Sequence, residues 1–85
     1  MLVVVLDVPP NETMTENVFG ILPNGETAWQ IERDESLVTA YPGMDYVGVT
    51  DIPEDDKKIK CHHFAGFMMI IDVTSGKILD TIETK

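Results

Sequence analysis

The sequence KIKCHHFAGFMMIIDVTSGKILDTIE, residues 58–83, decides the fold because no other part of the chain offers as much contiguous apolar surface. Its larger apolar residues are Ile59, Cys61, Phe64, Phe67, Met68, Met69, Ile70, Ile71, Val73, Ile78, Leu79 and Ile82. One sharp break at 72–77 divides the stretch, and Gly76 there can supply a residue at positive φ. The pattern predicts a C-terminal β-hairpin made of a long apolar strand, a loop and a return strand. The rest of the chain is expected to pack on or beside it.

The N-terminal third predicts further strands. Residues 2–8 are aliphatic with no helical period, and Pro9-Pro10 ends them. Their nearly continuous apolarity favours a central position in a sheet. Residues 11–22 fit two structures, because Thr13 to Glu16 has the spacing of a capping box whereas residues 18–22 are rich in strand formers. A hairpin closed by the turn sequence PNGE at 23–26 accounts for both flanks, and we expect that hairpin.

The middle of the chain predicts one short helix and one short strand. Asp34 can cap a helix over residues 34–43, which Pro42-Gly43 would end. Residues 46–50 follow as a strand, and residues 51–57 form an acidic loop that leads into the hairpin. The expected fold class is α+β: a single small domain over residues 1–85, with a mostly antiparallel sheet of five or six strands and one or two short helices.

Charge is the unusual feature of the composition. The chain has 85 residues and a formal net charge of −9. Residues 1–56 contain twelve acidic residues and one basic residue, Arg33, whereas residues 57–85 contain five lysines and three acidic residues. The acidic part therefore repels itself unless the lysine-bearing hairpin or a basic partner lies against it. Direct binding of nucleic acid is not expected, because no basic stripe exists to replace the counterions of phosphate.

The sequence predicts a cytoplasmic protein. The single Cys61 cannot form an internal disulfide, which fits a reducing compartment. The apolar residues 1–6 are too few for a membrane span and lack the basic region of a signal peptide. We therefore expect no contact with a membrane.

Cys61-His62-His63 is the only cluster of thiol and imidazole ligands. Because neighbours on a strand face apart, Cys61 and His63 share one face and His62 the other, so at most two could bind one metal ion. The same spacing disfavours a thiol enzyme, since no nucleophile, base and orienting group come together. A metal site or small enzyme built on these residues is kept as an alternative. We assign no catalytic residue and no cofactor.

Acidic side chains supply the leading hypothesis. They could form one negative face that docks on a basic protein surface, which makes the protein a small acidic binding module of the inhibitor or immunity type. The residues assigned to this face are Glu32, Asp34, Glu35, Asp45, Asp51, Glu54, Asp55 and Asp56. Plain solubility is the competing explanation of the same charge. A third hypothesis is a self-associating structural domain, because Met68 and Met69 predict apolar side chains on both faces of one strand and a second copy could cover one face as a homodimer.

Overall fold

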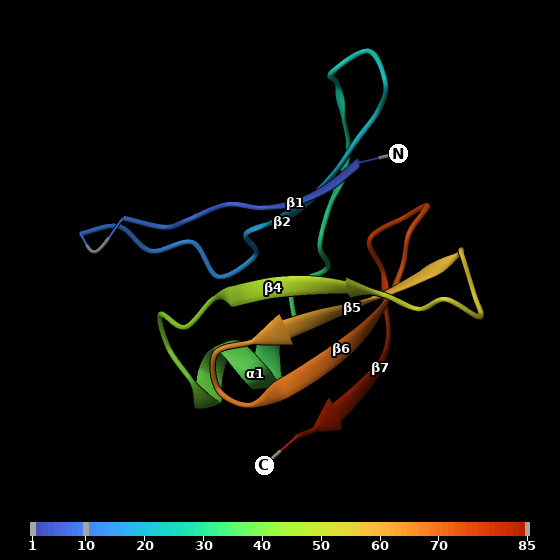
Figure 1. Cartoon of the computed structure of the whole chain (residues 1–85). Coiled ribbons are helices and arrows are strands. Elements are labelled where there is room, and N and C mark those ends of the chain that lie inside the picture. The colour runs from blue at the N-terminus through green and yellow to red at the C-terminus, as the bar shows by residue number, and fades with distance from the viewer. Residues whose placement is uncertain (1, 10, 85) are drawn as a thin grey trace.

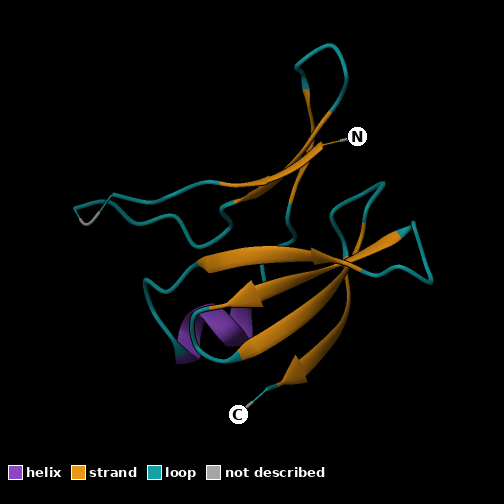
Figure 2. Ribbon diagram, in the orientation of Figure 1, coloured by secondary structure: helices purple, strands orange, loops and turns teal. Residues whose placement is uncertain are grey.

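The computed structural model describes residues 2–9 and 11–84, which form two antiparallel sheets and one helix (Figures 1 and 2). The first sheet has the order β1-β2-β3 and consists of β1 (Leu2–Val5), β2 (Val18–Ile21) and β3 (Thr27–Gln30). The second has the order β4-β5-β6-β7 and consists of β4 (Tyr46–Asp51), β5 (Lys58–His63), β6 (Phe67–Asp72) and β7 (Ile78–Glu83). The helix α1 (Glu35–Ala40) connects the two sheets in chain order. No helix in this part of the chain is long and apolar enough to span a membrane.

The predicted α+β class is wrong. The described residues are mostly β, with seven strands and a single helix of six residues. The strands form two sheets, of three and four strands, where one sheet of five or six was expected. Two local features account for the difference: an additional turn within the C-terminal stretch, and a first sheet whose edge does not pair with the second.

The additional turn lies at residues 64–66. The stretch predicted as one long strand is two antiparallel strands, β5 and β6, which pair from Lys58↔Asp72 to His63↔Phe67. Gly66 has a positive φ of 91°, and its N–H donates to the His63 carbonyl at 3.0 Å. The second half of the prediction is confirmed, because β6 and β7 form the C-terminal hairpin and Gly76 has a φ of 76°. An apolar turn is hard to recognise in sequence, since Phe64 and Ala65 lack the usual turn chemistry.

The first sheet contains the predicted hairpin of β2 and β3, and residues 11–17 are not helical. The Leu22 N–H donates to the Glu26 carbonyl at 2.8 Å across the turn. The central position predicted for the first strand is wrong, because β1 pairs only with β2 and lies at the edge of its sheet. Leu2 accordingly keeps 63% of its surface exposed.

The helix α1 confirms the predicted cap. The Asp34 carboxylate accepts hydrogen bonds from the Leu37 N–H at 3.1 Å and from the Ser36 hydroxyl at 2.7 Å. The Ser36 hydrogen bond is the main cause that lowers the pKa of Asp34. Leu37 is buried in the core, and the ring of Tyr41 packs at 5.6 Å from that of Phe67. The helix thereby covers the inner face of the second sheet.

Trp29 connects the first sheet to the C-terminal hairpin. Its indole N–H donates to the Val73 carbonyl at 2.8 Å, and only 7% of the residue is exposed. The ring lies between two glycines: a Cβ added at Gly20 would be 2.4 Å from the ring and one added at Gly76 2.5 Å from it. Glycine at both positions is therefore required by contact with the indole.

Asn17 connects the first sheet to the second. It is fully buried, and its side-chain amide donates to the carbonyls of Leu6 at 2.9 Å and Tyr46 at 2.8 Å. Its amide oxygen accepts the Tyr46 N–H at 2.8 Å. The side chain thus occupies both backbone groups of Tyr46 on the edge of β4, as a neighbouring strand would.

We predict that Asn17→Ala lowers the free energy of unfolding by about 3 kcal/mol, because it leaves buried backbone groups of Tyr46 unpaired. Urea unfolding followed by circular dichroism measures the change. Asn24→Ala is the matched control: the Asn24 side chain accepts only the Glu26 N–H, in an exposed turn, and should cost less than about 1 kcal/mol. Equal losses in the two variants would contradict the role of Asn17.

We predict that Gly76→Ala destabilises the protein more than Gly25→Ala. Both glycines have positive φ, 76° and 88°, but a Cβ at Gly25 meets nothing within 4 Å. The alanine at position 25 should cost about 1 kcal/mol for its backbone conformation. The one at position 76 adds overpacking against Trp29, for a total of about 3 kcal/mol. Thermal unfolding of the two variants compares them, and similar losses would show that the indole tolerates the added methyl group.

Candidate functional site

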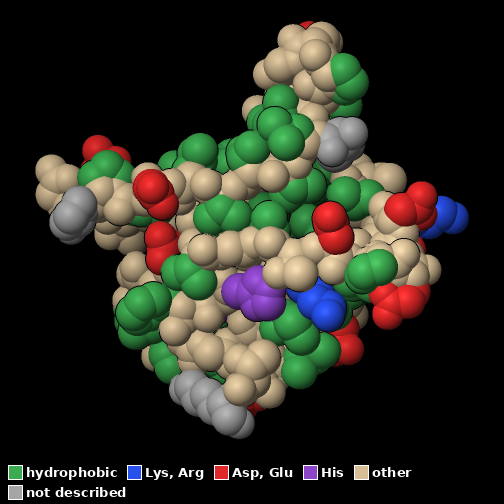
Figure 3. Space-filling model, viewed as in Figure 1, with side chains coloured by type: hydrophobic (Ala, Val, Ile, Leu, Met, Phe, Trp, Pro, Cys, Tyr) green, Lys and Arg blue, Asp and Glu red, His purple; other side chains and the backbone are tan. Residues whose placement is uncertain are grey.

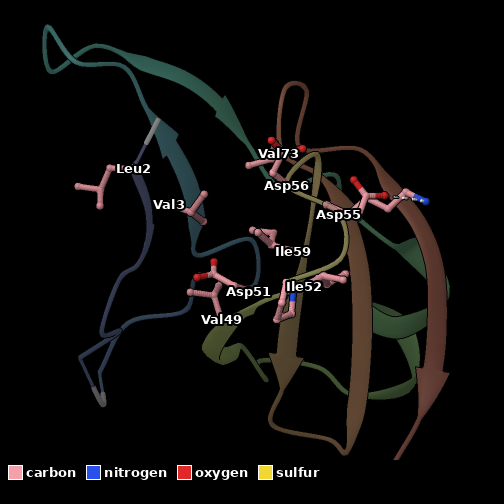
Figure 4. A pocket seen from close by; sticks show the side chains of 11 residues that line it. Leu2, Val3, Val49, Asp51, Ile52, Asp55, Asp56, Ile59 and Val73 are labelled. Carbon is pink, nitrogen blue, oxygen red and sulfur yellow. Dashed lines mark ion pairs between the residues drawn. The ribbon is translucent and has the colours of Figure 1, made fainter.

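A pocket of about 500 Å³ opens between the two sheets (Figure 4). One wall is the N-terminal end of β1, with Leu2 and Val3, and the opposite wall is the C-terminal end of β4, with Val49 and Asp51. The loop between β4 and β5 and the start of β5 close its floor and one side. The pocket exists because β1 and β4 are both sheet edges that lie near each other without forming a common ladder.

The walls of the pocket are apolar. Ile59 is 7% exposed, and Val3, Ile52 and Val73 are half-buried around it. Leu2 and Val49 line the entrance, with 63% and 36% of their surfaces exposed. Exposed aliphatic side chains beside a cavity are unfavourable in water, and a ligand that covered them would release that water.

Carboxylates surround this apolar lining. Asp51, Asp55 and Asp56 line the pocket together with a single cationic side chain, Lys58. Lys58 Nζ lies 3.6 Å from Asp55 Oδ2, so the one lysine is already paired with the one acid nearest to it. Asp51 and Asp56 are exposed, and no ion pair within residues 2–9 and 11–84 neutralises them. The pocket therefore carries net negative charge at pH 7.

The other five acids assigned to the acidic face lie elsewhere, and three of them have structural contacts. Glu32 accepts the Ile78 N–H at 2.9 Å and thus ties the end of β3 to β7. Asp34 caps α1. Glu35 lies 2.6 Å from the Arg33 guanidinium, which also lies 3.4 Å from Glu16.

The two remaining acids of that set have no such contact. Glu54 is exposed in the same loop as the pocket acids but does not line the pocket. Asp45 lies close enough to His63 to affect its titration. The acids that share one concave surface are therefore Asp51, Asp55 and Asp56, whereas those near α1 are partly balanced by Arg33.

Cys61 and His63 both point into the core, as the alternation of β5 predicts. Cys61 is fully buried, and burial raises its pKa to about 12. His63 is 6% exposed, and burial is the main cause that lowers its pKa. Its Nδ1 accepts the Ala65 N–H at 3.1 Å, and its ring packs edge-on against Tyr46 at 5.1 Å. Cys61 therefore packs in the core, and His63 both packs there and stabilises the turn after β5.

His62 lies on the opposite face of β5, where its Nε2 is 2.8 Å from the Thr50 hydroxyl. Within residues 2–9 and 11–84, no three side chains of His, Cys, Asp or Glu come close enough together to hold a metal ion. The structure therefore gives the metal alternative no ligand set to build on in this part of the chain.

Sequence reasoning identified the acids of the pocket but missed its walls. Leu2 and Val3 were expected inside a central strand, and Ile52 and Val49 carried no signal of a cavity. A cavity arises from which strand edges are left unpaired, and this depends on contacts between distant segments. Asn17, which joins the two sheets, also lies in no recognisable motif.

A family model matches residues 1–82 of the chain. The chain belongs to that family, the domain of unknown function DUF7957. No curated protein and no solved structure matches the chain. The match covers both walls of the pocket, from Leu2 to Val73, so the pocket lies wholly within the DUF7957 domain.

We predict that Cys61 is almost unreactive in the folded DUF7957 domain. With a pKa of about 12, a fraction on the order of 10⁻⁴ of the thiol is ionised at pH 8, whereas a thiol in an unfolded chain ionises near pH 8.5. Reaction with an aromatic disulfide reagent at pH 8 should be at least about 100-fold slower in native protein than in urea.

The same shift predicts a pH dependence of stability. Because the folded pKa of Cys61 is raised, its contribution to stability is complete below the pKa of the unfolded thiol and is lost as pH rises above that value. The difference in the free energy of unfolding between the wild type and Cys61→Ala, measured in urea at pH 7 and at pH 10, isolates the contribution of the thiol.

The reactivity prediction has its own contradicting outcome. Equal reactivity of Cys61 in native and unfolded protein would show that the thiol is accessible.

Proposed function

We propose that this protein is a binding module without catalytic activity that acts in the cytoplasm and holds a basic segment of a partner protein in the pocket between its sheets. The observation that supports the proposal most directly is the combination of apolar walls with unpaired carboxylates, Asp51 and Asp56, around one cavity. An inhibitor or immunity-type role, in which the module covers a basic surface of its partner, is the form of this function that the charge favours.

Lysine and arginine side chains fit this combination. Both have an aliphatic stem that packs on apolar surface and a cationic end that pairs with carboxylates. An aliphatic stem lying between Leu2 and Val49 would place its charged end beside Asp51, which lies on the same wall as Val49 (Figure 4). The volume of about 500 Å³ is large enough for such a side chain and parts of its neighbours.

The net negative charge of the whole chain also favours a basic partner. A net charge of −9 attracts a basic partner over distances of about a Debye length and speeds the encounter. Arg33 is held by Glu16 and Glu35, and Lys58 by Asp55, so these cations do little to weaken the field at Asp51 and Asp56. Binding is therefore expected to depend strongly on salt.

The state of the thiol favours binding over catalysis. Cys61 is buried and protonated, and His63 is occupied by Ala65 and Tyr46. Neither residue lines the pocket. A nucleophile would have to be both ionised and accessible to a substrate, and Cys61 is neither.

We predict that Asp51→Lys with Asp56→Lys weakens binding of the native partner at least about tenfold, because both carboxylates line the pocket without an ion pair in the described residues. The partner is isolated from cytoplasmic extract on immobilised protein at low salt, and its Kd is then measured by calorimetry. Raising NaCl from 50 to 500 mM should weaken the wild-type complex by a comparable factor, because the contacts are between charges.

Glu26→Lys with Glu83→Lys is the matched control, since it changes the net charge equally at two exposed positions outside the pocket. It should reduce the affinity much less than the pocket variant. If both variants lost affinity equally, the charge of the chain and not the pocket would carry binding. Binding that did not change with salt would exclude an electrostatic partner altogether.

A further inference from the structure

The outer face of the second sheet is not covered by the rest of the described chain. Ile59, Cys61, Met69 and Ile71 point into the core on the inner side, where α1 packs. The alternate side chains point outward, and the register places them in two rows across the sheet. They are Gly48, His62, Met68 and Ile82 in one row and Thr50, Lys60, Ile70 and Asp80 in the other. Figure 1 shows this face toward the viewer with α1 behind the sheet, and Figure 3 shows the side chains of the same face uncovered.

The centre of this face is apolar. Met68 and Ile70 are only half-buried on β6, and Ile82 beside them on β7 keeps 40% of its surface exposed. Figure 3 shows hydrophobic, histidine and basic side chains side by side across these strands. An antiparallel sheet with one solvated face normally carries polar side chains there. Apolar side chains at the centre of the exposed face therefore indicate that another surface covers them.

The charges on either side of this centre are of opposite sign. In the row through Ile70, Lys60 of β5 lies on one side and Asp80 of β7 on the other, each one strand away. Neither side chain forms an ion pair within residues 2–9 and 11–84. At a strand spacing of about 4.8 Å, the two lie too far apart across Ile70 to pair closely with each other. Both charges therefore remain available to a partner from outside the subunit.

The arrangement is self-complementary under a two-fold axis. If a second sheet is stacked face to face with the axis along β6, β5 of one copy lies over β7 of the other, and β6 lies over β6. Ile70 then meets the partner subunit's Ile70, and Lys60 meets the partner subunit's Asp80 in the same row. The symmetry generates the pair twice, and the sheet separation of about 10 Å suits side chains of this length.

We propose that the outer face of β4–β7 is the interface of a homodimer, with Met68 and Ile70 at its centre and Lys60–Asp80 pairs between subunits on both sides. The interface is small. Four strands of six residues cover about 20 Å by 14 Å, about 280 Å² on each copy and about 560 Å² in total, which is below the roughly 1,200 Å² of stable specific interfaces. The dimer is therefore expected to be weak, with a Kd of about 100 μM, and each copy keeps its pocket outside the contact.

Sedimentation velocity from 5 to 500 μM in 150 mM NaCl tests the proposal. The wild type should convert from about 9.5 kDa toward twice that mass over this range. Ile70→Lys should weaken the dimer at least about tenfold, because it places two like charges at the centre of the interface. Met14→Lys makes the same change in charge at an exposed apolar residue before β2 and should leave dimerisation unchanged. A wild-type protein that stays monomeric at 500 μM would overturn the proposal and assign the face to a different partner.

Charge reversal tests the two-fold arrangement itself. Lys60→Asp makes the chain more negative and Asp80→Lys makes it less so; a general effect of net charge would therefore move the two variants in opposite directions. Paired contacts predict that both variants lose about tenfold in affinity and that the double variant regains it. Unchanged dimerisation in both single variants would exclude the Lys60–Asp80 pairing. These results are independent of the pocket, because Lys60, Ile70 and Asp80 do not line it.

Discussion

The architecture depends on one buried amide. Asn17 pairs with the backbone of Tyr46 on the edge of β4 and with the Leu6 carbonyl just after β1. A continuous ladder between β1 and β4 would have produced one seven-stranded sheet and left no space between them. A single side-chain amide satisfies the edge of β4 at one position only. The two sheets are therefore joined at Asn17 and remain separate along the rest of β1 and β4. The pocket lies at the other end of β1, next to Leu2 and Val3.

Trp29 is the second connection, and it holds the opposite side of the first sheet. Its indole N–H binds the Val73 carbonyl, and the side chain of Val73 lines the pocket. The Glu32 N–H donates to the Gly76 carbonyl at 3.0 Å in the same loop. The loop before β7 is therefore fixed by the first sheet, and with it one wall of the cavity. Because both connections involve buried hydrogen bonds, the pocket is expected to be formed before any ligand binds.

Local chemistry was predictable from the sequence wherever a few neighbouring residues determine the structure. Asp34 caps α1, Gly76 takes a positive φ, and the turn after Leu22 closes the β2–β3 hairpin, all as expected. The alternation of Cys61, His62 and His63 between the two faces of β5 was also correctly predicted. Each of these depends on φ preferences, caps or the two-residue period of a strand, which act within a few residues.

Pairing between distant segments could not be predicted in this way. Apolar residues at the start of the chain are typical of a central strand, yet β1 lies at the edge of its sheet. An edge position is compatible with these residues because their side chains face the core and the pocket. The turn at 64–66 was missed for a related reason, since apolar residues with one glycine do not distinguish a bend from a continuous strand. The acids of the pocket were identified by charge alone, and their grouping followed from where the loop at 51–57 is placed.

The placement of the lysines explains why the acids remain available. The sequence led us to expect that the lysine-bearing hairpin would lie against the acidic part of the chain. Among the lysines of residues 11–84, only Lys58 forms an ion pair with an acid, Asp55, whereas Lys60 points to the outer face of the second sheet. Asp51 and Asp56 are exposed to water, so leaving them without an ion pair costs the fold little stability. The chain instead separates its charges onto two surfaces, so that a basic partner in the pocket and a second copy on the sheet would not compete for the same residues.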